Sequence, residues 1–250
     1  DLPADKKVEF REINQKLALL SVQFGENVLK EDNAFELVIE TEEDLAGLPD
    51  RVITTASETA GERGKEGKWV FTLHKPSLIP FLQNSDKREL REKIFKAYVE
   101  RGNNGNQFDN KQICSQIAEL RIRRANLLGY ATHAAFVLED NMAKNPESVY
   151  LFLQQLWKPA IARAKREAAD LQKMLDAEGS TFTLQPWDWW YYAEKLKKVE
   201  YALDDAELRP YFQLEKVREG AFMVANKLFG ITFSERTDIP VYHPDVKTFE

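Results

Sequence analysis

Apolar residues recur at three- and four-residue spacing along most of this 250-residue chain, and this periodicity restricts its fold more than any other feature. The first segment predicts a long helix with one apolar stripe, formed by Phe10, Ile13, Leu17, Leu20 and Phe24. Stripes of this kind, ended by glycines and prolines, predict further helices. We expect them at residues 49–60, 109–128, 132–138, 146–178, 186–198 and 214–229, with another that carries Leu90, Ile94 and Tyr98.

Short runs of β-branched and aromatic residues predict a few strands. Residues 35–39 and 69–73 are expected to pair as a two-stranded β element, while residues 231–233 and 241–249 indicate strand near the end. The predicted fold class is therefore mainly α and multi-helical, with a small β element and a C-terminal strand.

Local signals refine these boundaries. Thr41 and Ser85 are each predicted to cap a helix start, and Pro159 should bend or split the helix over 146–178. Pro76 and Pro80 interrupt the stretch around them, to which no helix or strand is assigned. Residues 102–106 form a loop by composition, so the chain is expected to be one mostly helical segment, 1–250, with a possible sub-boundary near 102–108.

Composition excludes several classes of protein. The net charge is −6 and the charged residues of both signs are mixed, which gives no electrostatic footprint for nucleic acid or an anionic membrane. No apolar run approaches the roughly 20 residues that span a bilayer. The single cysteine, Cys114, permits no internal disulfide, which favours the cytoplasm, with the periplasm as the alternative. Because the chain lacks an initial Met and stops at Glu250 inside a predicted strand, we expect a piece of a longer protein.

The three histidines, His74, His133 and His243, argue against a metal site in this chain. None lies in H-E-x-x-H, the motif that places two imidazoles on one helix face with a general base between them. No two are close enough in sequence to form a local metal motif. We expect each to be a partly buried, hydrogen-bonded side chain.

No other pattern assigns a catalytic or cofactor-binding residue. Cys114 lies on a helix stripe and is expected to be a packed or half-exposed thiol, not a nucleophile. Gly61, Gly64 and Gly67 match no phosphate-binding spacing and indicate a flexible loop. The cluster Arg121, Arg123 and Arg124 is expected to be a salt-bridged helix face.

The densest aromatic segment is Trp187–Tyr192. On a helix, Trp187, Trp190 and Tyr191 would share one face, and Asp188 and Tyr192 another. We expect these rings mainly to pack in a core with their polar tips satisfied; the alternative is that part of the segment lines a groove.

Several runs, including this aromatic one, resemble the thimet-oligopeptidase-like family of zinc metallopeptidases. They match in order along nearly the whole chain, at residues 43–49, 127–134, 185–196, 208–214 and 227–231. The final run, Asp238-Ile239-Pro240-Val241-Tyr242-His243-Pro244-Asp245-Val246, is most similar to the peptidyl-dipeptidase (dipeptidyl carboxypeptidase) branch.

The resemblance implies a neurolysin-like, mostly helical enzyme whose two lobes flank a deep channel. Its H-E-x-x-H motif and third ligand, a glutamate, would lie beyond residue 250, so no zinc ligand or catalytic residue is assigned here. The implied chemistry is hydrolysis by a zinc-bound water, with the motif glutamate carrying its proton to the leaving amine.

Three interpretations remain open on this basis. The first is a segment of a peptidyl-dipeptidase, forming channel wall and scaffold, whose parent binds zinc and oligopeptides while the segment alone binds no zinc and is inactive. The second is an endo-acting oligopeptidase of the same family, and the third a non-catalytic helical interaction module. As part of a larger domain, the isolated chain should expose apolar surface and self-associate or dissolve poorly.

Overall fold

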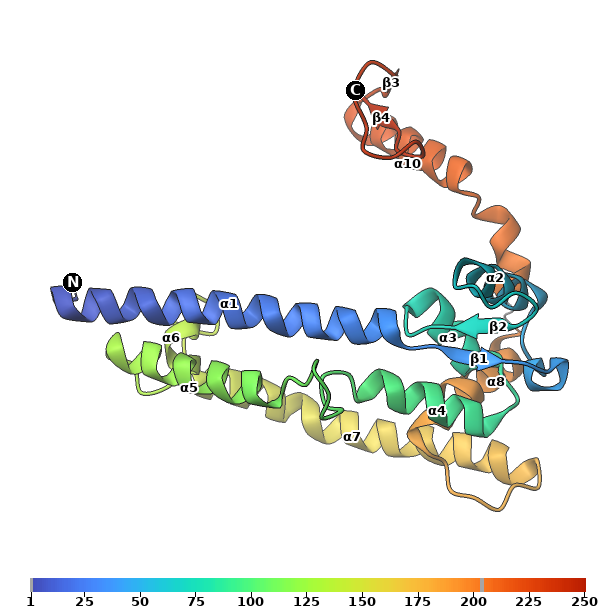
Figure 1. Ribbon diagram of the computed structural model, residues 1–250, viewed down its shortest axis with the longest axis horizontal. Helices are drawn as coiled ribbons and strands as arrows, with labels where there is room; N and C mark the ends of the chain where they lie inside the picture. Colours follow the sequence, from blue (N-terminus) through green and yellow to red (C-terminus); the bar gives the residue numbers. More distant parts are fainter. Residues whose placement is uncertain (1, 203–204) are drawn as a thin grey trace. The chain divides into compact units, whose positions relative to one another are not determined.

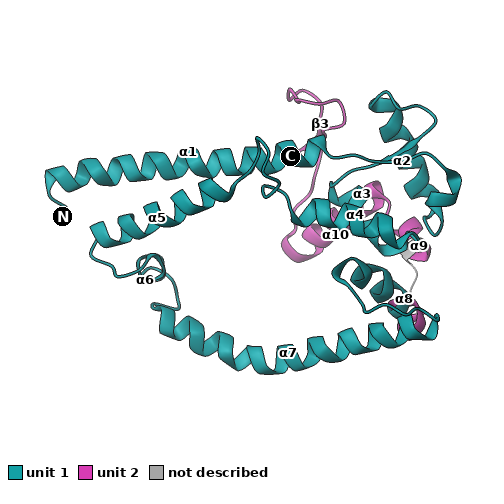
Figure 2. Cartoon of the chain, turned by 60° about the horizontal axis from the view of Figure 1, so that its bottom comes forward, with its two compact units in different colours: residues 1–196 teal, residues 197–250 magenta. Residues whose placement is uncertain are grey.

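The computed structural model describes residues 2–202 and 205–250. The chain forms two compact units, Asp1–Leu196 and Lys197–Glu250 (Figures 1 and 2). Helices dominate both units, and the strands are short, as the sequence predicts. Within the described residues, no helix is both long and apolar enough to cross a bilayer.

Unit 1 begins with a pair of long antiparallel helices, α1 (Ala4–Ala34) and α5 (Lys111–Leu127), which lie side by side (Figure 1). The predicted apolar stripe of α1 forms half of their contact. Its buried members and those of α5 make one small core: Ile13, Leu17, Leu20, Ile113 and Leu120. Three-to-four-residue spacing puts these side chains on one face of each helix, which is why the two helices pair.

The largest core of unit 1 surrounds the small β element. Strands β1 (Leu37–Ile39) and β2 (Trp69–Phe71) pair antiparallel, as predicted. Around them lie η1, α2, α3 and α4, which span Glu42–Leu45, Asp50–Glu62, Lys75–Asn84 and Arg88–Val99. The sheet and these helices bury Leu37, Ile39, Val52, Phe71, Phe81 and Ile94 together.

A third core joins the end of one helix to the start of another. Unit 1 continues through α6 (His133–Leu138), α7 (Pro146–Ala177), η2 (Pro186–Asp188) and α8 (Trp189–Tyr201), whose residues from Lys197 onward belong to unit 2. Only the C-terminal end of α7 takes part in this core, through Leu171 and Leu175, which pack on Tyr191 and Tyr192. The aromatic segment therefore packs as expected at these two tyrosines, whereas Trp189 and Trp190 stay 37% and 40% exposed.

Unit 2 is built on α10 (Leu214–Phe229), whose bounds match the prediction. Gly230 ends it with φ +70°, a left-handed conformation that glycine adopts without strain. The short α9, η3, β3 and β4 span Asp205–Leu208, Arg209–Tyr211, Glu235–Arg236 and Thr248–Phe249. Strands β3 and β4 pair antiparallel, and the Phe222 ring contacts the rings of Phe233 and Phe249.

The prediction of strands near the C-terminal end is mostly wrong. Residues 231–233 are not strand, and only Thr248–Phe249 of the expected 241–249 run is. Pro240 and Pro244 interrupt this part of the chain, and proline cannot donate the hydrogen bond that a strand interior needs. Aromatic and β-branched composition alone was therefore a poor guide here.

Two prolines that seemed to interrupt the chain lie inside a helix. Pro76 occupies the first turn of α3, where its missing N–H would be unpaired in any case, and Pro80 lies further along the helix. Pro159 likewise does not split α7, which runs unbroken from Pro146 to Ala177 and is drawn as one curved helix in Figure 2.

Neither hydroxyl predicted to cap a helix start does so. Thr41 precedes η1, but its Oγ1 donates to the Asp44 carboxylate at 2.9 Å and caps no backbone N–H. Ser85 ends α3, and α4 starts later, after Lys87. The hydroxyl of the buried Ser85 instead accepts a hydrogen bond from the backbone N–H of Lys87 at 3.3 Å, and its carbonyl oxygen accepts one from Arg91 at 2.7 Å.

Candidate functional site

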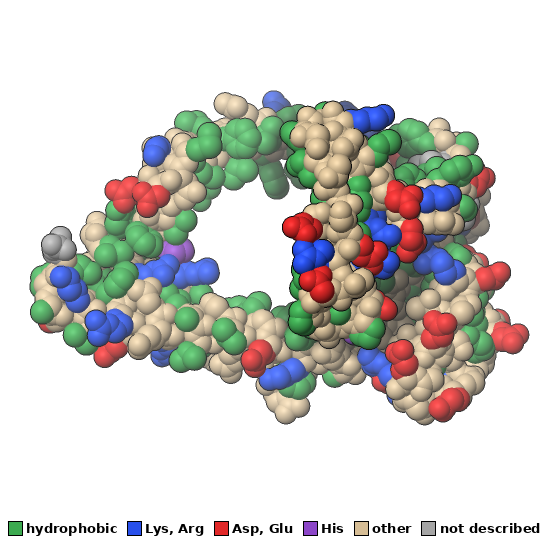
Figure 3. Space-filling model, turned by 90° about the horizontal axis from the view of Figure 1, so that it is seen from above, with side chains coloured by type: hydrophobic (Ala, Val, Ile, Leu, Met, Phe, Trp, Pro, Cys, Tyr) green, Lys and Arg blue, Asp and Glu red, His purple; other side chains and the backbone are tan. Residues whose placement is uncertain are grey.

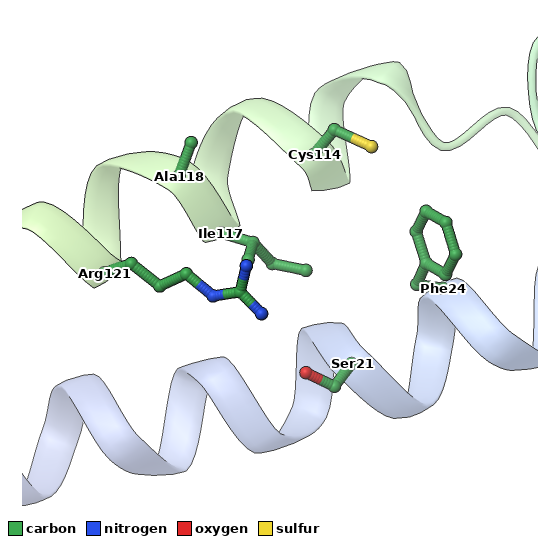
Figure 4. A pocket seen from close by; sticks show the side chains of 6 residues that line it. All are labelled: Ser21, Phe24, Cys114, Ile117, Ala118 and Arg121. Atoms are coloured by element: carbon green, nitrogen blue, oxygen red, sulfur yellow. The ribbon is translucent and has the colours of Figure 1, made fainter. Parts of the chain in front are cut away.

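The hollow between α1 and α5 is one place in unit 1 where polar and reactive side chains meet an apolar wall. Its volume is about 370 Å³, and its lining comes from both helices: Ser21, Phe24, Cys114, Ile117, Ala118 and Arg121. Figure 4 shows Ile117 and Arg121 extending from α5 toward α1. The hollow therefore offers an apolar surface with one cation, one thiol and one hydroxyl.

The polar groups of this hollow are not arranged for nucleophilic catalysis. The Ser21 hydroxyl donates to the Leu17 carbonyl at 2.7 Å, a bond within its own helix. Cys114 is exposed, and no histidine lines the hollow to act as its base. An apolar groove of this kind can bind an apolar or aliphatic side chain, but its residues carry no hydrolytic step.

The arginine cluster is only partly the salt-bridged face that the sequence predicts. Arg123 pairs with Glu9 of α1 at 3.0 Å, and both side chains are about half exposed. Arg124 donates to Asn14 at 3.0 Å, which is a hydrogen bond to a neutral group. Arg121 has no ion-pair partner within residues 2–202 and 205–250. The cluster thus ties α5 to α1 through two of its three members.

The three histidines lie in separate parts of the fold. His74 is exposed just before α3, His133 begins α6, and His243 lies in unit 2, where its Nδ1 accepts from the backbone N–H of Asp245 at 3.3 Å. Burial and, after it, the nearby Arg121 and Arg124 charges lower the pKa of His133, whose Nδ1 is buried without a partner in the described structure. The expectation of partly buried, hydrogen-bonded histidines is therefore wrong for His74 and His243, which are exposed, and His133 meets only the burial part of it.

Zinc would need three or so imidazole, thiolate or carboxylate ligands around one point. In the part of the chain that the structure describes, no three His, Cys, Asp or Glu side chains gather in that way. The residues described here do not fit a zinc ion, and no step of a metal-assisted reaction is assigned to them.

The most enclosed ionic group is Asp188, at the end of η2. Its carboxylate is fully buried and accepts hydrogen bonds from Arg91 Nη2 at 2.9 Å and from Arg88 Nε and Nη2 at 3.0 and 2.9 Å. The backbone N–H of Gln185 adds a fourth donor at 3.1 Å. Two cations and a backbone donor satisfy this carboxylate, so the cluster fastens η2 to α4.

Only a weak signal of the Asp188 cluster is present in the sequence. Asp188 and Tyr192 were expected to share a helix face, but Asp188 belongs to a 3-10 turn and α8 begins only at Trp189. Arg88 and Arg91, three residues apart on one helix, are the signal that a carboxylate could lie opposite. Their partner, however, is about 100 residues away.

A second buried carboxylate, Glu31, holds the asparagine-rich loop onto α1. It accepts hydrogen bonds from the Asn104 and Asn106 side chains at 3.0 and 2.7 Å and from the Gly102 backbone N–H. Burial raises the pKa of Glu31, but these three donors outweigh it and hold the pKa below 4.5. The loop at residues 102–106 is thus anchored to α1 by a charged group.

A third feature is an apolar hollow of about 430 Å³ beside α7. It is lined by Ala168 of α7 and by Leu184, Gln185, Pro186, Trp189 and Trp190. Elsewhere on α8, Tyr192 donates to Glu178 at 3.1 Å, and burial together with that hydrogen bond raises the pKa of Tyr192 to about 12. The two exposed tryptophans therefore line a surface hollow, which is the alternative that the sequence left open for part of this segment.

Comparison with known proteins places these features in a family. The model of Peptidase family M3 matches residues 81–250, which is more than half of the chain. The chain therefore belongs to peptidase family M3, a family of zinc metallopeptidases, and the resemblance seen in the sequence is confirmed.

Two of its curated relatives differ in the activity that their names give. The chain is 39% identical to the dipeptidyl carboxypeptidase of Salmonella typhimurium over 250 residues and 38% identical to the oligopeptidase A of the same organism over 253. The match covers 100% of this chain in both cases but only 37% of each relative. The chain thus spans little more than a third of their length, and similarity does not separate the two kinds.

Proposed function

We propose that this chain is a structural segment of a longer zinc metallopeptidase that releases dipeptides from the free C-terminus of oligopeptides. The observation that carries the proposal is the 39% identity to a dipeptidyl carboxypeptidase along the whole chain. An oligopeptidase that cleaves inside peptides is the second candidate, favoured by the nearly equal 38% identity to oligopeptidase A.

The role proposed for these 250 residues is to form channel wall and to support the catalytic part. Three features support it: the paired helices α1 and α5, the buried ionic cluster at Asp188, and the anchored loop at residues 102–106. Each fixes the relative position of segments far apart in sequence, which is what a wall around a reaction site requires.

The first experiment tests the isolated chain. We expect less than one zinc per chain by metal analysis and no cleavage of a fluorogenic peptide, with or without added zinc. A catalytically active M3 relative, assayed in parallel, shows that the conditions support turnover. Metal-dependent cleavage by the isolated chain would contradict the structural role.

The second experiment tests the activity of the longer protein, expressed from the complete gene. A peptide with a free C-terminal carboxylate and the same peptide amidated are digested, and the products are identified by mass spectrometry. Release of C-terminal dipeptides from the free form alone supports a peptidyl-dipeptidase. Internal cleavage of both peptides at equal rates supports the oligopeptidase, and cleavage of neither contradicts both.

A further inference from the structure

The N-terminal half of α7 is an apolar helix that unit 1 leaves uncovered. The run Tyr150–Trp157 contains no charged residue, and its large side chains are half or more exposed. The exposed fractions are 65% for Tyr150, 60% for Phe152, 51% for Leu153, 50% for Leu156 and 68% for Trp157. A helix this apolar is normally covered by other parts of a protein.

Two of these side chains, Leu153 and Trp157, continue a stripe that is already used for packing. Leu153, Trp157, Ala164, Ala168, Leu171 and Leu175 follow one another at three-, four- or seven-residue spacing and so share one face of α7. At the C-terminal end of this stripe, Leu171 and Leu175 are buried against α8, at 2% and 0% exposure. The same face is therefore buried in a core at the C-terminal end of α7 and exposed to solvent at the N-terminal end.

The middle of the stripe is shaped to accept side chains. Ala164 and Ala168 are small, and Ala168 lines the apolar hollow of about 430 Å³ that Trp189 and Trp190 border. Figure 3 shows hydrophobic side chains gathered along the arm of unit 1 that contains α7, beside an opening. We name the surface made by Phe152, Leu153, Leu156, Trp157 and this hollow the α7 docking face.

The size of the α7 docking face suits a permanent contact. With side-chain areas of about 150–250 Å², its exposed fractions leave roughly 600 Å² of apolar surface open to water. That is at the upper limit of what soluble monomers expose and near the roughly 800 Å² that each partner buries in a stable interface. Because no charged side chain interrupts it, the matching surface must be apolar too.

We infer that the α7 docking face binds an amphipathic helix from the remaining part of the same peptidase chain. The inference rests on the proposed function, that these residues belong to a longer M3 peptidase. More than half of the length of the dipeptidyl carboxypeptidase relative lies outside the match, so a segment able to cover the face is available in such a protein. The continuity of the stripe with the buried contact at Leu171 and Leu175 argues for one extended core.

A cysteine-labelling experiment tests this directly. In the 250-residue chain with Cys114→Ser, Trp157→Cys places a thiol on the α7 docking face and Lys158→Cys places one on the opposite side of the helix. Phe152→Cys gives a second probe on the face. Each variant is labelled with a maleimide, alone and after mixing with the rest of the encoded protein expressed as a separate polypeptide and kept in chelator.

We expect both face probes to label freely in the chain alone and at least about tenfold more slowly in the complex, with the Lys158→Cys probe changed less than about twofold. Light scattering reports complex formation and circular dichroism reports folding, both without any peptidase activity. A complex in which the face probes stay reactive overturns the docking face but leaves the proposed function standing. Absence of any complex with the unsubstituted chain overturns both.

One further outcome would also overturn the inference. If the chain alone is a dimer whose face probes are already protected, the occupant is a second copy of this chain and not another segment of the peptidase. Light scattering of Trp157→Glu, which would then be monomeric, separates that result from a locally misfolded helix.

Discussion

Replacing Asp188 by asparagine removes the charge at the most enclosed ionic contact of unit 1. Asparagine keeps the shape of the side chain but leaves the Arg91 guanidinium, itself only 2% exposed, without its counterion. Breaking a buried pair by removing one partner costs about 3–5 kcal/mol, because a charge stays buried and uncompensated. Arg88 is 29% exposed and can regain water, so we expect the lower end, about 3 kcal/mol.

Urea unfolding followed by circular dichroism at 222 nm measures this loss. For a urea slope of about 2 kcal/mol/M, a loss of about 3 kcal/mol lowers the midpoint by about 1.5 M. Glu9→Gln is the matched control, since it breaks the half-exposed pair with Arg123 and should cost about 1 kcal/mol or less.

A third variant tests why Asp188→Asn loses stability. If the loss of stability comes from the buried and unpaired Arg91 charge, Arg91→Met in the Asp188→Asn background should recover part of the stability. The reasoning is refuted if Asp188→Asn is no more destabilising than Glu9→Gln, or if the double variant recovers nothing.

Three further predictions follow from local geometry. Gly64→Ala should cost about 1–2 kcal/mol for its φ of +66° alone. Gly47→Ala should cost clearly more, because its Cβ would also clash with the backbone carbonyl oxygen of Asn84 and meet the Asp86 carboxyl at 2.7 Å; equal midpoints in urea would contradict this. The pKa of Glu31 in the folded chain lies below 4.5, so its contribution to stability is complete above pH 4.5 and is lost as pH falls through the folded pKa. In a plot of stability against pH, Glu31→Gln should therefore reduce the fall in stability at acid pH. The raised pKa of Tyr192, about 12, means that its contribution to stability is complete below pH 10 and lost as pH rises toward 12. Burial also raises the pKa of Tyr191, so ultraviolet titration should show a late component that Tyr192→Phe reduces but does not abolish; a titration unchanged by that variant would contradict the assignment.

Much of the fold was predictable because its helices carry both a stripe and an end signal. α10 illustrates this, with apolar residues at helical spacing and Gly230 directly after its last turn. The pairing of β1 with β2 followed from two short β-branched and aromatic runs flanking one helix. In both cases the decisive information is local in sequence.

The errors arise where local signals conflict with context. Pro76 and Pro80 suppressed the prediction of α3, although a first-turn proline is compatible with a helix and the helix buries Leu78, Phe81 and Leu82. Residues 231–233 have strand composition but no pairing partner in the described fold. Tertiary packing, which the local pattern does not contain, decides both.

The candidate sites were less predictable than the fold. The hollow between α1 and α5 depends on which faces of the two helices come together, and its lining residues on α1 and α5 are 90 to 100 positions apart in sequence. The α7 docking face was anticipated only in general, as apolar surface that a piece of a larger domain would expose. The sequence alone could not locate this face on α7, because α7 has apolar residues both at its buried C-terminal end and at its exposed N-terminal end.

The long sequence distance between Arg91 and Asp188 also has a consequence for synthesis on the ribosome. Arg91 is made 97 residues before its buried counterion, a delay of about 5–20 s at usual translation rates. During that interval the core around β1 and β2 can assemble, but the guanidinium must stay hydrated, so this side of α4 cannot close. The N-terminal part of the nascent chain should therefore remain sensitive to protease until Asp188 has left the exit tunnel.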